Sequence, residues 1–191
     1  MRTFLALEIS PAIRQSVASV LESLAQQVPD RIVRWVRPEN VHLTLAFLGD
    51  FPGESIPQVQ DTVQKAAMET PPLGLSVGGL GAFPRPQAPR VVWIGVQEPT
   101  GRLLALEARL EEGLRRLGWE PADEPFRPHL TLGRVRRGSP RSDVERLAAI
   151  LQTDASGDLG SMIAPEVVVF RSELTPDGAV YTRLAGVPFQ G

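Results

Sequence analysis

The chain has 191 residues, a length that suits one substantial core or two small lobes and excludes two large independent domains. Its apolar content of 42% with 22% charge is typical of a globular protein, and no segment approaches the roughly 20 apolar residues that span a bilayer. The net charge of −2 provides no global field for collecting nucleic acid, and the absence of cysteine excludes disulfides and thiolate chemistry. We expect a cytoplasmic protein without a membrane anchor or signal peptide.

Four helices are predicted from apolar periodicity and capping residues. Ser10 and Pro11 supply an N-cap and a first-turn proline for a helix that continues to about Gln27. The other expected helices are at 55–68, 101–118 and 139–151.

Strands are predicted between these helices from β-branched and alternating segments. The expected strands are 3–9, 31–36, 41–50, 73–83, 90–96, 129–135, 164–174 and 179–187. The proline-rich loop 84–89 should prevent continuous pairing of the strands beside it. The last two strands should form a hairpin around Pro176, Asp177 and Gly178. Helices interspersed with antiparallel hairpins indicate the α+β class.

One tetrapeptide, HLTL, occurs twice, at 42–45 and at 129–132. Each half of the chain contains one copy, and both copies lie in a pattern of strand, helix and strand. This repetition predicts a single domain over 1–191, made of two pseudo-symmetric lobes.

The motif places a histidine and a threonine on one face of each strand, because successive side chains alternate. His42 and Thr44 share a face in the first copy, and His129 and Thr131 share one in the second. If the lobes pack about a twofold axis, the four groups meet across a cleft. Two imidazoles on opposite sides of a phosphate can act as general acid and general base, while the hydroxyls stabilise charge on phosphate oxygens. These four residues are the candidate catalytic set, and the two histidines are the only ones in the chain.

Metal and nucleotide chemistry have no matching motif. Neither histidine lies in an HExxH or His/Cys pattern, and no P-loop is present. The glycines of 78–83 precede a proline-rich loop instead of the helix that a dinucleotide fingerprint requires. We expect no metal and no cofactor.

Several segments together resemble the two-histidine (2H) phosphoesterase superfamily, and more closely its RNA 2′,3′-cyclic phosphodiesterase branch, the bacterial and archaeal 2′-5′ RNA ligases. These segments are RTFLALEIS, RWVRPENVHLTLAFLGD, RVVWIGV, PFRPHLTLGRV and the closing strand pair with Tyr181. The resemblance implies a bilobal, pseudo-twofold fold with two antiparallel sheets lining a central cleft and helices outside.

The resemblance also implies a reaction. It is the hydrolysis of a 2′,3′-cyclic phosphate to a 2′-phosphomonoester, with His42 as proton donor and His129 as proton acceptor. Reversible, ATP-independent 2′,5′ ligation is similar to what some members perform. The implied partner is RNA with cyclic phosphate ends, tRNA fragments included, and we expect a monomer.

Arg134 follows the second motif and matches a family position that contacts the phosphate or ribose. Regular alternation would turn it to the leucine face, so the strand must bend or bulge at Gly133. Four more arginines are either solvated surface or a basic rim for RNA: Arg127, Arg136, Arg137 and Arg141.

Three aromatic residues are candidates for stacking on a terminal base: Phe4, Trp35 and Phe126. The alternative for each of them is a position in the hydrophobic core. Phe47 alternates with Leu43 and Leu45 and is expected in the core.

Two other functions fit the same residues. One is a non-catalytic module that binds RNA ends, although binding alone would tolerate exchange of the paired histidines and threonines. The other is the same chemistry on a small cyclic nucleotide or a 2′,5′-linked oligonucleotide.

Overall fold

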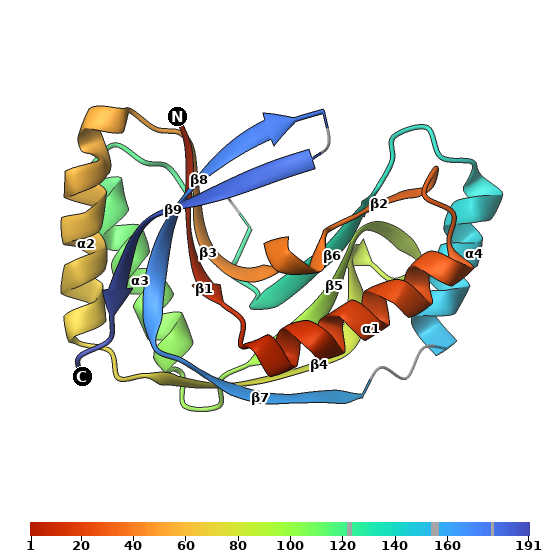
Figure 1. Cartoon of the computed structure of the whole chain (residues 1–191), viewed down its shortest axis with the longest axis horizontal. Helices are drawn as coiled ribbons and strands as arrows, with labels where there is room; N and C mark the ends of the chain where they lie inside the picture. Colours follow the sequence, from red (N-terminus) through yellow and green to blue (C-terminus); the bar gives the residue numbers. More distant parts are fainter. Residues whose placement is uncertain (122–123, 154–156, 177) are drawn as a thin grey trace.

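The computed structural model describes residues 1–121, 124–153, 157–176 and 178–191, and it shows an α+β fold (Figure 1). Within these residues four α-helices are present: α1 (Pro11–Gln27), α2 (Ile56–Met68), α3 (Arg102–Arg115) and α4 (Arg141–Thr153). Nine strands form one sheet: β1 (Arg2–Glu8), β2 (Val33–Trp35), β3 (His42–Asp50), β4 (Leu73–Arg85), β5 (Ala88–Gln97), β6 (His129–Val135), β7 (Asp158–Ala164), β8 (Glu166–Thr175) and β9 (Gly178–Pro188). The short 3-10 helices η1 (Pro38–Asn40) and η2 (Gly53–Ser55) precede β3 and α2.

The predicted helices and strands are confirmed to within a few residues, and the local signals act as expected. The Ser10 hydroxyl accepts a hydrogen bond from the Ile13 amide at 3.3 Å and caps α1. The helix after Gly101 ends at Arg115, three residues before Gly118, whose φ of 82° turns the chain. Asp177, part of the predicted final turn, lies outside the described residues.

Two sequence expectations about the strands need correction. The loop predicted at 84–89 is shorter, because β4 and β5 pair as far as Arg85 and Ala88, with a register shift after Phe83. Two of its three prolines, Pro84 and Pro89, pair with each other near the end of this ladder, where a lost amide donor disrupts little pairing. Strand β7 was not predicted at all.

The sheet has two matching halves, with the order β9-β8-β1-β3 on one side and β7-β4-β5-β6 on the other. They join where β3 meets β6, through the register pair Leu43 and Leu130. The two sheets expected from the sequence are therefore halves of one continuous sheet.

Helices α1 and α3 cross between the halves (Figure 1). Helix α1 follows β1 of the first half but packs against β7 of the second, whereas α3 follows β5 of the second half and packs against β3 and α2. One core cluster includes residues from the four helices and from both sheet halves. This exchange ties the halves together.

Each motif strand contains a bulge directly after its threonine. In β3, Thr44 pairs with Ala6 but Ala46 pairs with Leu5, and in β6 the register next to β5 also gains one residue between Thr131 and Gly133. An extra residue reverses the alternation that follows it. The bulge expected at Gly133 is therefore present.

The bulges bring two further side chains onto the histidine face. Arg134 reaches this face after the bulge in β6, as the sequence required. The core position predicted for Phe47 is wrong: its side chain is 55% exposed, because the bulge in β3 turns it away from Leu43 and Leu45.

A substitution at Gly133 tests the second bulge, because a Cβ atom there would lie 2.7 Å from side-chain atoms of both Trp35 and Val33. We expect Gly133→Ala to lower the free energy of unfolding by about 1 to 3 kcal/mol, measured by urea denaturation. Gly74→Ala is the matched control, since nothing lies within 4 Å of a Cβ at that strand position. Equal stability of the two variants would contradict this account of the bulge.

Candidate active site

The four motif side chains come together because β3 and β6 pair antiparallel at Leu43 and Leu130. In that register His42 lies opposite Thr131, and Thr44 lies opposite His129. The two leucines are at most 2% exposed and face the core, whereas the histidines and threonines are half-buried on the other face. The structure thus brings together all four residues of the predicted catalytic set.

His42 is held in one orientation by its backbone and by aromatic rings. Its Nδ1 lies 2.8 Å from the Asn40 carbonyl oxygen, so a proton on Nδ1 donates to that carbonyl and Nε2 faces the cleft. The imidazole stacks on Phe4 at 4.7 Å between ring centroids and meets the Tyr181 ring edge-on at 5.4 Å. Asn40 also donates through Nδ2 to the Ala179 carbonyl at 2.8 Å, which ties the entry to β3 to the start of β9.

His129 is oriented by the same device in the other half. Its Nδ1 lies 2.6 Å from the carbonyl oxygen of Arg127, again two residues earlier in the chain. The Phe83 ring meets it edge-on at 4.9 Å, and Trp93 lies 6.3 Å away. Both histidines therefore present Nε2 as the reactive nitrogen.

Burial disfavours the charged form of both rings. It lowers the pKa of His42 from 6.5 to about 4, with the Asn40 carbonyl opposing the shift and the Arg14 charge adding to it. Burial also lowers the pKa of His129, opposed by the Arg127 carbonyl and assisted by Arg134. In the free protein at neutral pH both rings are neutral, and an anion bound between them would raise both pKa values.

The three aromatic residues predicted to stack on a base differ in their surroundings. Phe4 is 2% exposed and lies against His42, so it supports the catalytic ring and offers no surface to a base. Trp35 packs against the core across Gly133, on the same side as Val33 and away from the histidine face. Phe126 is half-buried against the main core. Alternation within one strand cannot reveal these positions, because they depend on the neighbouring strands.

Several aromatic residues beside the site were not predicted from the sequence to be site residues. Phe47 presents an exposed ring 6.3 Å from that of Phe4. Phe170 stacks on Phe4 at 5.1 Å, and Tyr181 meets the same ring edge-on at 4.9 Å. Only a bulge in β3, of the kind that the sequence already required in β6, could have pointed to Phe47.

The two halves of the site differ in chemistry at matching positions. Phe47 follows the first bulge and pairs with Phe4, whereas Arg134 follows the second and pairs with Val91. Arg134 also pairs with Arg34 of β2. At this position of the histidine face one half therefore has an aromatic ring, and the other has a guanidinium group.

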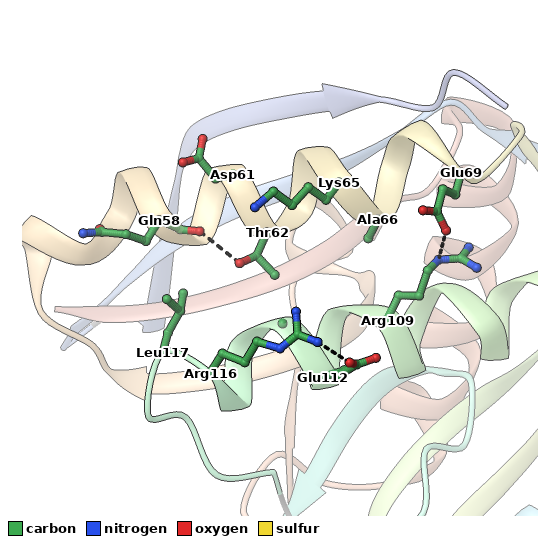
Figure 2. Close-up of a pocket in the computed structure, with 11 residues that line it drawn as sticks. Gln58, Asp61, Thr62, Lys65, Ala66, Glu69, Arg109, Glu112, Arg116 and Leu117 are labelled. Atoms are coloured by element: carbon green, nitrogen blue, oxygen red, sulfur yellow. Dashed lines mark hydrogen bonds and ion pairs between the residues drawn. The ribbon is translucent and has the colours of Figure 1, made fainter.

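One hollow lies outside this face, between α2 and α3, with a volume of about 380 Å³ (Figure 2). Its charges are largely balanced by ion pairs, Arg116 with Glu112 and Arg109 with Glu69, and Arg109 also donates to Thr70 at 2.7 Å. A smaller pocket of about 250 Å³ borders His42 and Tyr181. The smaller pocket includes His42 but not His129, and the outer groove contains neither histidine.

In the part of the chain that the structure describes, no three histidine or acidic side chains are grouped to hold a metal ion. No helix there is long and apolar enough to cross a membrane.

The fold and site define a two-histidine phosphoesterase, and comparison with known proteins agrees. The family model described as LigT-like phosphoesterase matches residues 7–93 and 94–181, one match for each half. The chain belongs to the LigT-like phosphoesterase family, within the 2H superfamily.

Curated relatives match over nearly their whole length. An RNA 2′,3′-cyclic phosphodiesterase of Archaeoglobus fulgidus is 36% identical over 96% of this chain and 98% of its own. One of Methanothermobacter thermautotrophicus is 35% identical over 95% of both.

Solved structures match the fold as well. A crystal structure of a Thermus thermophilus protein has a TM-score of 0.79 and 28% identity, and covers 100% of this chain and 99% of its own. E. coli LigT complexed with 3′-AMP has a TM-score of 0.76 and 25% identity, with 100% and 98% covered.

The lowered pKa of His42 predicts a pH-dependent stability. In the unfolded chain His42 is protonated below pH 6.5, whereas in the folded protein it is protonated only below about pH 4. The free energy of unfolding is therefore highest above pH 6.5 and falls as the pH drops. Between pH 7.5 and pH 4.5 we expect His42 to account for a loss of about 2 to 3 kcal/mol. Urea unfolding at both pH values should show a smaller loss in His42→Gln than in the wild type. Equal losses would show that burial does not suppress this charge.

Proposed function

We propose that this protein hydrolyses RNA ends with a 2′,3′-cyclic phosphate to 2′-phosphomonoesters, through acid and base catalysis by His42 and His129. The observation that carries the proposal is the register of β3 and β6, which sets each histidine opposite the other motif's threonine. The curated relatives are RNA 2′,3′-cyclic phosphodiesterases, and E. coli LigT has been crystallised with 3′-AMP, a ribonucleotide with its phosphate on the sugar.

The reaction needs one proton acceptor and one proton donor on opposite sides of phosphorus. Nε2 of His129 takes a proton from water as the water oxygen bonds to phosphorus, and Nε2 of His42 gives a proton to the 3′ oxygen as its bond to phosphorus breaks. The hydroxyls of Thr44 and Thr131 donate to the non-bridging oxygens, where negative charge increases.

The low pKa of His42 in the free protein is compatible with the donor role once substrate is bound. The phosphodiester brings a negative charge between the two rings, which favours a protonated imidazole beside it. Neither step requires a metal ion or a nucleotide cofactor.

Contacts to the rest of the nucleotide follow from the two halves of the site. Phe47, with its exposed ring, is the stacking surface for the terminal base in place of Phe4, Trp35 and Phe126. Arg134 contacts the phosphate or ribose from the other half.

The same groups serve ligation without ATP. An RNA 5′-hydroxyl replaces water, its oxygen bonds to phosphorus as the 3′ oxygen leaves, and a 2′,5′ linkage results. We propose that residues 1–191 act as one monomeric, cytoplasmic domain on RNA ends, tRNA fragments among them.

Replacing either histidine tests the mechanism. With an RNA oligonucleotide ending in a 2′,3′-cyclic phosphate, and EDTA present, we expect wild-type turnover to persist. His42→Ala and His129→Ala should each reduce kcat/KM by about 10²- to 10⁴-fold, because each removes one proton transfer.

Lys65→Gln in the outer groove is the control and should retain full activity, since the groove has no part in the reaction. Full activity of either histidine variant would overturn the two-histidine mechanism. Loss of wild-type turnover in EDTA would overturn metal independence.

A further inference from the structure

We infer that Arg34 and Arg134 together form a second anion site, which binds the phosphate on the 5′ side of the terminal nucleotide. This inference rests on the proposed function and narrows it. The preferred substrate is an RNA chain or a 5′-phosphorylated nucleotide, and a nucleoside cyclic phosphate without that second phosphate is a poorer substrate.

The two guanidinium groups belong to directly paired residues on the histidine face. Arg34 of β2 pairs with Arg134 of β6, and both side chains are exposed. Among the described residues neither has an acidic partner. Like charges at paired strand positions repel each other, so an anion bound between them would relieve a cost that the free protein bears.

Other arginines near the site are already engaged, which sets this pair apart. Arg14 donates to the carbonyl oxygens of Pro38 and Ile9 at 2.8 and 3.4 Å. Arg183 is bound by Glu8 and Glu166, at 2.8 and 2.7 Å. Arg34 and Arg134 keep their donors for a ligand.

The hairpin of β8 and β9, which projects from the rest of the sheet (Figure 1), brings the start of β9 close to Arg34. An Nη2 atom of Arg34 lies 3.8 Å from the position that a Cβ would take on Gly178, at the start of β9. The charges of Arg134 and Arg34 also act on Tyr181: they lower its pKa against the larger effect of burial, which raises it. Because the Tyr181 ring contacts His42, the second anion site adjoins the first.

Ribose geometry matches the spacing of these features. In a 2′,3′-cyclic phosphate the base on C1′ and the 5′ carbon on C4′ lie on the same face of the ribose, but the base adjoins the 2′ end of the fused ring and the 5′ carbon adjoins its 3′ end. Phe47 and Arg134 occupy matching positions of β3 and β6, which run antiparallel, so they lie at opposite ends of the site. A base on Phe47 therefore directs the 5′ phosphate toward Arg34 and Arg134.

The test compares adenosine 2′,3′-cyclic phosphate with and without a 5′-phosphate. We expect the wild type to prefer the 5′-phosphorylated compound by about tenfold in kcat/KM, because a hydrogen bond to a charged group contributes about that factor. Arg34→Gln should lose this preference while keeping wild-type kcat/KM on the compound without a 5′-phosphate. Arg141→Gln, which removes an exposed arginine of α4 paired with Glu145, is the charge-matched control and should keep the preference.

Two results would overturn the inference. One is a wild type without preference for the 5′-phosphate. The other is an equal loss on both compounds in Arg34→Gln, which would place Arg34 on the reactive phosphate.

If the wild type cleaves neither compound nor an RNA oligonucleotide with a 2′,3′-cyclic phosphate end, the proposed function fails, and binding still tests the second anion site. Calorimetry should then show adenosine 3′,5′-bisphosphate bound about tenfold more tightly than 3′-AMP by the wild type but not by Arg34→Gln. Equal affinities of the wild type for the two ligands would reject the site.

Discussion

The pairing of Leu43 with Leu130 is the contact on which the whole site depends, because it joins the two sheet halves and fixes their register. A slip of one residue would turn the histidines and threonines of one strand into the core, and a slip of two would separate each histidine from its opposite threonine. Burial of both leucines opposes either slip. A hydrophobic contact behind the strands thus sets the geometry of the polar groups in front of them.

A structural feature of this protein can be predicted from the sequence when the signal for it lies within one short segment. Caps, apolar periodicity and the HLTL alternation are local, and they predicted the helices, most strands and the four motif side chains. The positions of Phe4 and Trp35 depend on neighbouring strands, so a single strand cannot reveal that one lies under His42 and the other behind Gly133. Strand β7 has weak local signals, with glycine and serine among its residues, and is stabilised by pairing with β4.

The bulges explain why the sequence predicts the position of Arg134 correctly and that of Phe47 wrongly. The sequence required a bulge at Gly133, where glycine allows the close approach of Trp35. The matching position in the first motif is Ala46, which gives no such signal, although its strand bulges in the same way. Both halves therefore contain the bulge, but the side chain that follows it is an aromatic ring in one half and a guanidinium group in the other. That difference gives a nearly symmetric site a direction for binding a nucleotide.

The central claim is that His42 protonates the 3′ oxygen while His129 activates water, so the position of the product phosphate is the most direct measurement. Phosphorus NMR of the products from an RNA oligonucleotide with a 2′,3′-cyclic phosphate end distinguishes 2′- from 3′-phosphomonoesters. The account predicts a 2′-phosphate. A 3′-phosphate would contradict it, because the 2′ oxygen would then be the leaving group and the nucleotide would lie in the reverse direction between the two histidines.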